Sequence, residues 1–132
     1  MALRWYSTVI ESTDHRALAQ WWAEALRWDV AFATDAEAAV MPPWGPEFVE
    51  QLRFEQVPPG LLFVPVEHAK SVKNRLHLDF APHTSTDREA EVSRLLELGA
   101  TQVDVGQPPE ATWTVLADPE GNEFCILSSR EM

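Results

Sequence analysis

The residues best suited to chemistry gather in the second half of the chain. His77 and Asp79 stand two positions apart in an alternating run, so a strand would place them on one face. Glu123 and Cys125 are spaced in the same way in a later run. A carboxylate can orient an imidazole for proton transfer, so His77 with Asp79 or Glu123 is the candidate acid–base group. The alternative is that a nearby basic residue pairs with Asp79, and that His77 is a wall residue.

Cys125 is the single cysteine of the chain, which excludes an internal disulfide and any Cys-x-x-Cys motif. Inside a strand such a residue is more typical of a small buried hydrophobe than of a nucleophile. Three tryptophans are candidates for a ligand-binding wall: Trp5 and Trp113 on predicted strands, and Trp44 in a proline-rich segment. Their rings would stack on flat ligands or hold cations.

The elements that must position these residues repeat in the two halves of the chain. Residues 3–11 and 75–81 predict opening strands, and each is followed by capping residues and a helical pattern. Further strands are expected at 29–34 and 37–41 in the first half, and at 101–105 and 112–117 in the second. Gly60 and Gly121 are each expected in a turn that leads into a final strand.

Both predicted helices carry an apolar stripe. The first, over about 14–27, places Leu18, Trp21, Trp22, Ala25 and Leu26 on one face. The second is expected to begin at the capping box Thr86-x-x-Glu89, to bury Val92, Leu95 and Leu96, and to end at Gly99. The Asp118–Gly121 stretch suits a type I turn.

The segment 42–59 breaks the repeat, because it holds five of the ten prolines. It is interpreted as a loop or lid over a cavity, or as an irregular connection packed on the sheet. Within it, residues 47–53 fit one short helix or a strand.

Composition and charge exclude several classes of protein. A chain of 132 residues fits one domain. With 21 acidic against 10 basic residues, the net charge of −11 disfavours nucleic acid and anionic membranes as partners. No apolar run approaches the roughly 18 residues of a membrane span. The first residues lack the pattern of a signal peptide, so a cytoplasmic location is expected.

Three stretches together carry a resemblance to a known superfamily. They are 73–79 (KNRLHLD), 98–101 (LGAT) and 117–125 (ADPEGNEFC). In order and spacing they resemble the glyoxalase-like subgroup of the vicinal oxygen chelate superfamily, which includes glyoxalase I, bleomycin-resistance proteins and dioxygenases. The resemblance implies an α+β fold, with 1–132 as a single glyoxalase-like domain. Two βαβββ modules, about 3–68 and 74–129, would form an incomplete barrel around one pocket.

The resemblance also implies four metal-ligand positions, which fall here on Ser7, Val64, His77 and Cys125. Val64 has no donor atom, and Ser7 is a poor ligand for a divalent ion. His77 and Cys125 are candidate donors, but two protein ligands fall short of the three or four usual for zinc. We therefore expect no cofactor and no glyoxalase I activity.

Three functions compete on these grounds. The first is a small-molecule-binding protein of the bleomycin-resistance type, with an aromatic or apolar ligand and a binding set of Trp5, Ser7, Trp44, Val64, Trp113 and Cys125. The second is a metal-independent isomerase or lyase that uses the His77 group. The third is a metal enzyme with substituted ligands. A homodimer is expected, with Trp21 and Trp22 either in the core or in an apolar contact patch.

Overall fold

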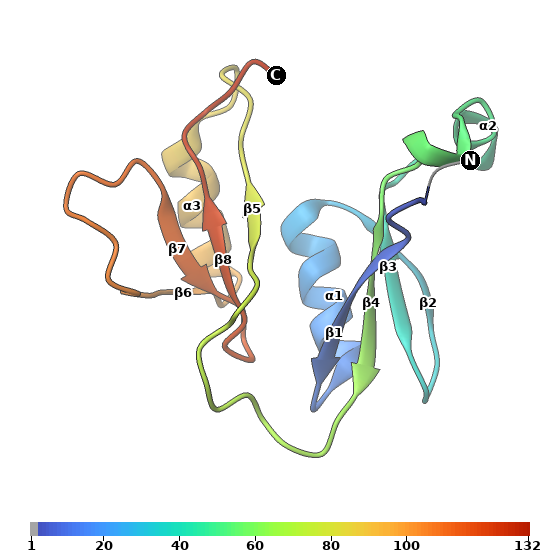
Figure 1. The fold of residues 1–132 in the computed structure, drawn as a ribbon, viewed down its shortest axis with the longest axis horizontal. Helices are drawn as coiled ribbons and strands as arrows, with labels where there is room; N and C mark the ends of the chain where they lie inside the picture. Colours follow the sequence, from blue (N-terminus) through green and yellow to red (C-terminus); the bar gives the residue numbers. More distant parts are fainter. Residues whose placement is uncertain (1–2) are drawn as a thin grey trace. The chain divides into compact units, whose positions relative to one another are not determined.

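The computed structural model describes residues 3–132, which divide into two compact units that meet in sequence at Ala69 and Lys70 (Figure 1). Each unit is one βαβββ module, so the α+β class and the two-module repeat are confirmed. Each unit is described by itself. The single pocket expected from both modules, and their union in one domain, stay predictions.

The two modules share one strand order. The first holds β1 (Ser7–Ser12), α1 (His15–Leu26), β2 (Asp29–Ala33), β3 (Ala38–Met41), α2 (Pro46–Val49), the 3-10 turn η1 (Phe54–Gln56) and β4 (Gly60–Pro65). The second holds β5 (Leu78–Phe80), α3 (Arg88–Glu97), β6 (Thr101–Gln102), β7 (Thr114–Ala117) and β8 (Glu123–Ile126). The sheets run β1-β4-β3-β2 and β5-β8-β7-β6, and in each the first and last strands of the module are parallel neighbours.

Helix α1 forms close to the predicted bounds. The Asp14 carboxylate accepts a hydrogen bond from the Ala17 amide at 3.2 Å, and Arg27 ends the helix in the left-handed conformation. Its apolar stripe packs mainly on β3 and β4. Trp21 and Trp22 are buried there with their rings edge to face. They are core residues, so the alternative of an exposed contact patch at these two positions is wrong.

Helix α3 is capped differently from the prediction. Asp87 is the N-cap, and its carboxylate accepts from the Ala90 amide at 3.2 Å. The predicted capping box is wrong because Thr86 lies one residue too early to cap the first free amides. Gly99 follows the helix with a positive φ of 115°, in agreement with the predicted end.

Helix α3 joins its sheet through a narrow apolar face and one arginine. Leu95 is buried, whereas Leu96 is exposed, so the expected stripe is wrong at Leu96. The Arg88 guanidinium also connects the helix to the sheet through three hydrogen bonds. It donates to Thr114 Oγ1 of β7 at 3.0 Å, to the Ile126 carbonyl of β8 at 2.7 Å, and to the carbonyl of Leu127, the next residue, at 2.9 Å.

Both opening strands are shorter than predicted, because pairing sets their ends. The partner of β1 begins at Gly60, opposite Ser7, so residues 3–6 are outside the strand. In the second module only 78–80 pair with β8. Gly60 itself is not a turn glycine. It begins β4, where a Cβ would collide with the Met41 side chain, so its role is close approach.

The proline-rich segment forms helix rather than strand. Pro46 occupies the first turn of α2, where its fixed φ is favourable. The exposed Trp44 packs edge to face on Phe48 at 5.1 Å between ring centroids. A role as a lid stays a prediction. Among the described residues, no helix has the length and apolar character that crossing a bilayer requires.

Candidate functional site

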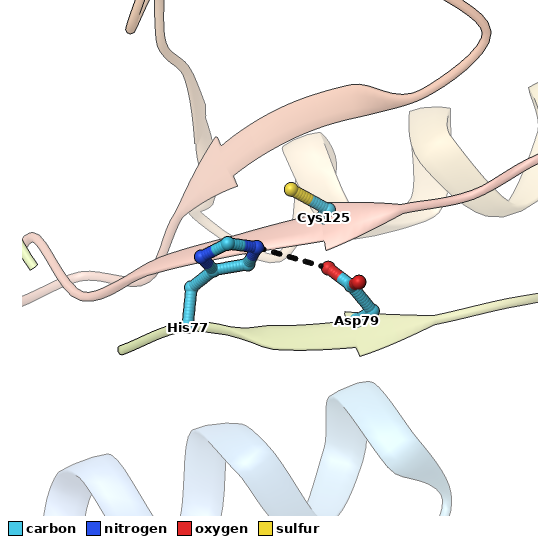
Figure 2. A group of neighbouring side chains, drawn as sticks. All are labelled: His77, Asp79 and Cys125. Carbon is cyan, nitrogen blue, oxygen red and sulfur yellow. Dashed lines mark ion pairs between the residues drawn. The ribbon is translucent and has the colours of Figure 1, made fainter. Parts of the chain in front are cut away.

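The candidate site of the second unit is built on two parallel strands. Asp79 of β5 is the register partner of Cys125 of β8. His77 lies two residues before Asp79, and its side chain is on the same face (Figure 2). Val115 of β7 pairs with Cys125 from the other side, so Asp79, Cys125 and Val115 form one row across the sheet. The alternation used in the sequence analysis therefore brings the expected residues together.

His77 and Asp79 form an ion pair when the imidazole is protonated. The Nε2–Oδ1 distance is 3.2 Å, and each side chain is about half exposed, at 48% and 49%. The alternative in which a basic residue pairs with Asp79 is therefore wrong. Because one imidazole nitrogen faces a carboxylate, the pair has the geometry of an oriented acid–base group.

Cys125 lies buried beside this pair. Burial raises the pKa of the Cys125 thiol, and the charge of Asp79 and a hydrogen bond from the thiol to its carboxylate raise it further. Lys73 lowers this pKa and Glu123 raises it, each by a smaller amount. The thiol is therefore protonated at neutral pH and is a poor nucleophile.

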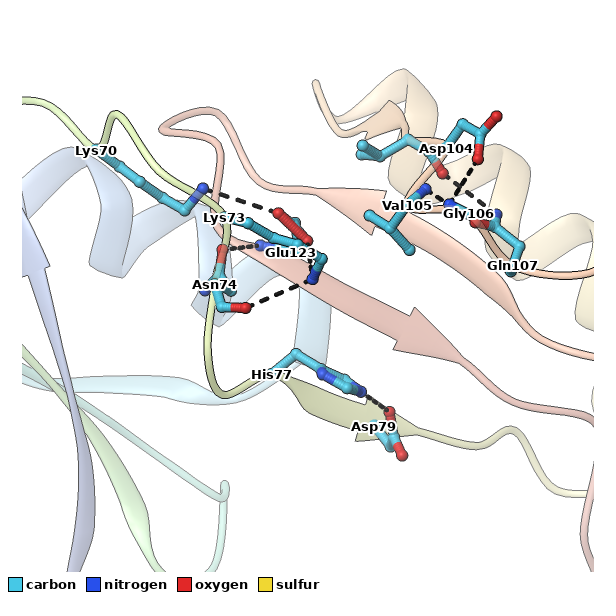
Figure 3. Close-up of polar contacts among 11 residues, drawn as sticks. Lys70, Lys73, Asn74, His77, Asp79, Asp104, Val105, Gly106, Gln107 and Glu123 are labelled. Carbon is cyan, nitrogen blue, oxygen red and sulfur yellow. Dashed lines mark hydrogen bonds and ion pairs between the residues drawn. The ribbon is translucent and has the colours of Figure 1, made fainter.

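Two lysines contact the Glu123 carboxylate, which makes it a poor general base (Figure 3). Its carboxylate is 3.1 Å from Lys73 Nζ and 3.8 Å from Lys70 Nζ, and its amide donates to Asn74 Oδ1 at 3.2 Å. Burial raises the pKa of Glu123, but the hydrogen bond and charge of Lys73 outweigh it, with help from Asn74 and Lys70, and the pKa is lowered. A carboxylate stabilised as an anion is a weak base, so His77 with Asp79 is the better acid–base group.

These residues border a cavity of about 310 Å³ within the second unit. Trp113, which is 36% exposed, supplies the aromatic part of the wall. Val105 reaches the cavity from the loop after β6, and its amide donates to Gln107 Oε1 at 2.9 Å (Figure 3). The full lining is Lys73, His77, Asp79, Val105, Trp113, Val115, Glu123, Cys125 and Leu127.

Four lining residues are not among the candidates predicted from the sequence: Lys73, Val105, Val115 and Leu127. Trp113 lies in the bend before β7, so its predicted place in a strand over 112–117 is wrong, because pairing with β8 begins only at Thr114. Val115 is the register partner of Cys125, and alternation could not find it from Trp113, which is outside the strand. Val105 was predicted as the last residue of a strand over 101–105. That prediction is wrong beyond Gln102, where β6 ends, and Val105 lies in the loop that follows.

The four candidates in the first unit take separate positions. Ser7 and Val64 lie half-buried on β1 and β4, whereas Trp5 precedes β1 with 63% of its surface exposed. Trp44 packs on Phe48. All of the cavity lining given above comes from the second unit, so a binding role for these four residues stays a prediction.

The donor set implied by the resemblance does not fit a metal ion, because Val64 offers no donor and Ser7 only a hydroxyl. The structure adds a third donor that the sequence analysis did not count. One ligand atom each of His77, Asp79 and Cys125 lies within 4.8 Å of the other two. Nitrogen, oxygen and sulfur donors in one group match the ligand chemistry of zinc.

Two βαβββ modules, each with its first and last strands paired in parallel, are the fold of the vicinal oxygen chelate superfamily. A family model described as a glyoxalase-like domain matches residues 7–127, so the chain belongs to the glyoxalase-like family of that superfamily. A search of curated protein sequences finds no match.

Solved structures of the superfamily share the fold. A glyoxalase/bleomycin resistance protein/dioxygenase family enzyme from Burkholderia phytofirmans aligns with a TM-score of 0.70 at 15% identity, over 97% of this chain and 100% of that one. The fosfomycin resistance protein FosX of Mesorhizobium loti gives 0.66 at 12%, over 98% and 95%. The bleomycin-binding protein of Streptomyces verticillus, solved with copper(II)-bleomycin, gives 0.55 at 15%, over 98% and 100%.

Proposed function

We propose that the chain is a small-molecule-binding protein whose ligand site includes the cavity of the second unit, and that the four-ligand metal site of its superfamily is degenerate. The observation that carries the proposal is the cavity itself. Its volume of about 310 Å³ falls in the range of ligand pockets, roughly 300–1,000 Å³. An aromatic and aliphatic wall facing a few polar groups is the usual composition of such a site.

The charges of the lining favour a neutral or cationic ligand. Lys73 is the one lysine or arginine of the lining, and His77 is paired with Asp79, against the two carboxylates of Asp79 and Glu123. Lys73 is also engaged by Glu123, so it is a weak attraction for an anion. Trp113 offers a ring face for stacking, and ring faces attract cations as well. A planar aromatic molecule without negative charge is therefore the ligand class proposed.

Matched bicyclic probes test the cavity and its charge preference together. We would titrate the untagged chain with 2-naphthol, N-methylquinolinium and naphthalene-2-sulfonate, and follow heat release and the indole NMR signal of Trp113. We expect the neutral and cationic probes to bind more tightly than the sulfonate. If no probe binds and the Trp113 signal does not move, the proposal fails.

A matched pair of variants tests the contribution of each module. Loss of probe binding in Trp44→Ala, with the fold intact by circular dichroism, would support a binding role for the first module. Unchanged binding in Trp44→Ala beside a loss in Trp113→Ala would confine the site to the second unit.

A second candidate function is a metal-independent isomerase or lyase. The observation that favours it is the 3.2 Å contact between His77 and Asp79 at the edge of the cavity. His77 would remove or return a proton next to a substrate carbonyl, and Asp79 would stabilise the imidazolium.

Deuterium exchange tests that reaction without a known substrate. We would incubate 2-indanone, whose protons lie next to a carbonyl, with the chain in D₂O and a metal chelator, and read exchange by NMR. We expect exchange above the buffer rate that is lost in His77→Ala and kept in the exposed control His68→Ala. Equal rates with and without protein would remove the enzyme candidate.

We also propose that the protein acts in the cytoplasm as a homodimer. A lone, buried thiol is compatible with a reducing compartment. Exposed apolar side chains of the first unit, such as Leu3 and Val9, are available for a subunit contact. Light scattering after size exclusion tests the dimer, and the mass of a single chain at micromolar concentration would refute it.

A further inference from the structure

We propose that His77, Asp79 and Cys125 form a zinc-binding site contained within the second unit. The backbone dictates their convergence. His77 and Asp79 share a face because they are two residues apart, and Asp79 and Cys125 are register partners on parallel strands. One donor atom of each lies within 4.8 Å of the others (Figure 2). Each donor belongs to a different class: imidazole nitrogen, carboxylate oxygen and thiol sulfur.

The geometry is close to that of a tetrahedral ion. With zinc–nitrogen and zinc–oxygen bonds near 2.0–2.1 Å and a zinc–sulfur bond near 2.3 Å, neighbouring ligand atoms are separated by roughly 3.3–3.6 Å. The His77 Nε2 and Asp79 Oδ1 atoms are already 3.2 Å apart. The sulfur is at most 4.8 Å from the other donors, so a movement of roughly 1 Å by side-chain rotation completes the triangle.

Replacing the contact between His77 and Asp79 with a bound ion also costs little stability. The contact between His77 and Asp79 is half exposed, so solvent screens it and it contributes little stability. Little is therefore lost when an ion replaces it. On binding, the Cys125 thiol would release its proton to solvent. The resulting thiolate and the Asp79 carboxylate would neutralise the two charges of zinc, and the neutral imidazole would complete three protein ligands. All three residues line the cavity, so the fourth position is left for water or a ligand atom.

This site differs from the set implied by the superfamily resemblance. It uses Asp79, which is absent from that set, and needs neither Ser7 nor Val64. It offers three protein donors, whereas the positions implied by the resemblance offer two. The inference does not depend on the proposed function, because ion binding is measured here without any organic ligand.

Metal titration of the chelator-treated, untagged chain tests the site directly. We expect one zinc ion per chain by competition with a chromophoric chelator. Cobalt(II) in its place should give the intense visible bands of a four-coordinate ion and a sulfur-to-cobalt charge-transfer band. Absence of zinc binding, absence of the sulfur band, or one ion for every two chains would each overturn the single-chain site. These readouts need no variant, so they stand even if a substitution unfolds the protein.

Conservative substitutions then assign the donors one by one. Asp79→Asn, His77→Ala and Cys125→Ser should each weaken zinc binding by more than the roughly 10- to 100-fold that loss of a residue supporting a metal ligand costs. The matched controls are Asp35→Asn and His68→Ala, both exposed residues of the first unit, and they should bind zinc as the wild type does. Wild-type affinity in a folded Asp79→Asn variant would overturn the proposal.

Discussion

Asp79 and Cys125 are register partners on the parallel strands β5 and β8, and the Asp79 carboxylate raises the pKa of the buried Cys125 thiol beyond the effect of burial. They are far apart in sequence, and the sheet register alone brings them together. This relationship links the half-exposed pair at the cavity edge to a buried thiol. Because the carboxylate raises the pKa of the thiol, a change at Asp79 should change the rate at which Cys125 reacts.

Asp79→Asn should make Cys125 easier to alkylate in the metal-free protein. The carboxylate raises the pKa of the thiol by its charge and by accepting its hydrogen bond, so its removal increases the thiolate fraction at pH 8. Burial, the largest cause of the raised pKa, remains, so we expect an increase of several-fold. Mass spectrometry after iodoacetamide treatment, with chelator present, measures the rate. Asp35→Asn is the control, and equal rates in all three proteins would contradict the assignment.

Glu123→Gln should lower the free energy of unfolding by about 1 kcal/mol at neutral pH, because it removes the ionic contact with Lys73, whose side chain is 59% exposed. Since the folded pKa of Glu123 is lowered, the contribution is present above the ordinary value of 4.5. It is lost as pH falls through the lower folded pKa. Urea unfolding of wild type, both single variants and Glu123→Gln/Lys73→Gln measures the coupling. An interaction free energy of zero between Glu123 and Lys73 at neutral pH would show that their contact does not stabilise the fold.

Asp118→Ala should destabilise the second unit by about 2–3 kcal/mol. The buried carboxylate accepts from the Glu120 amide at 2.9 Å, the Asn122 amide at 3.0 Å and the Asn122 side-chain amide at 2.8 Å. These bonds hold the turn that leads into β8 and its Cys125. Asp118→Asn keeps the shape and one acceptor oxygen, so its loss should be smaller. If urea unfolding shows equal stability for Asp118→Asn and Asp118→Ala, shape rather than hydrogen bonding explains the turn.

Gly121→Ala should cost about 1–2 kcal/mol, because this residue has a φ of 86°, where an L side chain is strained. A Cβ at Gly121 would meet nothing within 4 Å, so the cost isolates backbone strain from crowding. Gly45 is the matched control, since a Cβ there is also free of contacts and its φ is −66°. Gly45→Ala should change stability by less than about 0.5 kcal/mol. Equal effects of the two substitutions by thermal or urea unfolding would contradict this explanation.

The order of elements could be predicted from the sequence, because each depends on local pattern. The stripe through Trp21 and Trp22 predicted α1, and Gly99 predicted the end of α3. Strand ends could not be predicted, because β1 starts where its partner β4 starts. The close packing at Gly60 could not be predicted for the same reason, because only strand pairing brings the Met41 side chain against it.

The candidate site was predicted in part. Alternation placed His77 with Asp79 and Glu123 with Cys125, and the structure brings these pairs to one cavity. The engagement of Glu123 by Lys73 could not be predicted, because 50 residues separate them. The nearness of Asp79 to Cys125 depends on the register between β5 and β8, which no local pattern determines.

Trp113→Ala should weaken binding of 2-naphthol about 10-fold, which corresponds to about 1.4 kcal/mol. The indole is the one aromatic side chain in the cavity lining, and its ring face is the surface on which a planar ligand would stack. Trp113→Phe keeps a smaller ring face, so its loss should be less than that of Trp113→Ala. Phe32→Ala, an exposed aromatic residue of β2, is the control for a general effect of removing a surface ring. Calorimetry on all four proteins gives the comparison. If Trp113→Ala binds 2-naphthol as tightly as the wild type, the ligand does not use this wall, and the ligand class proposed for the cavity is wrong.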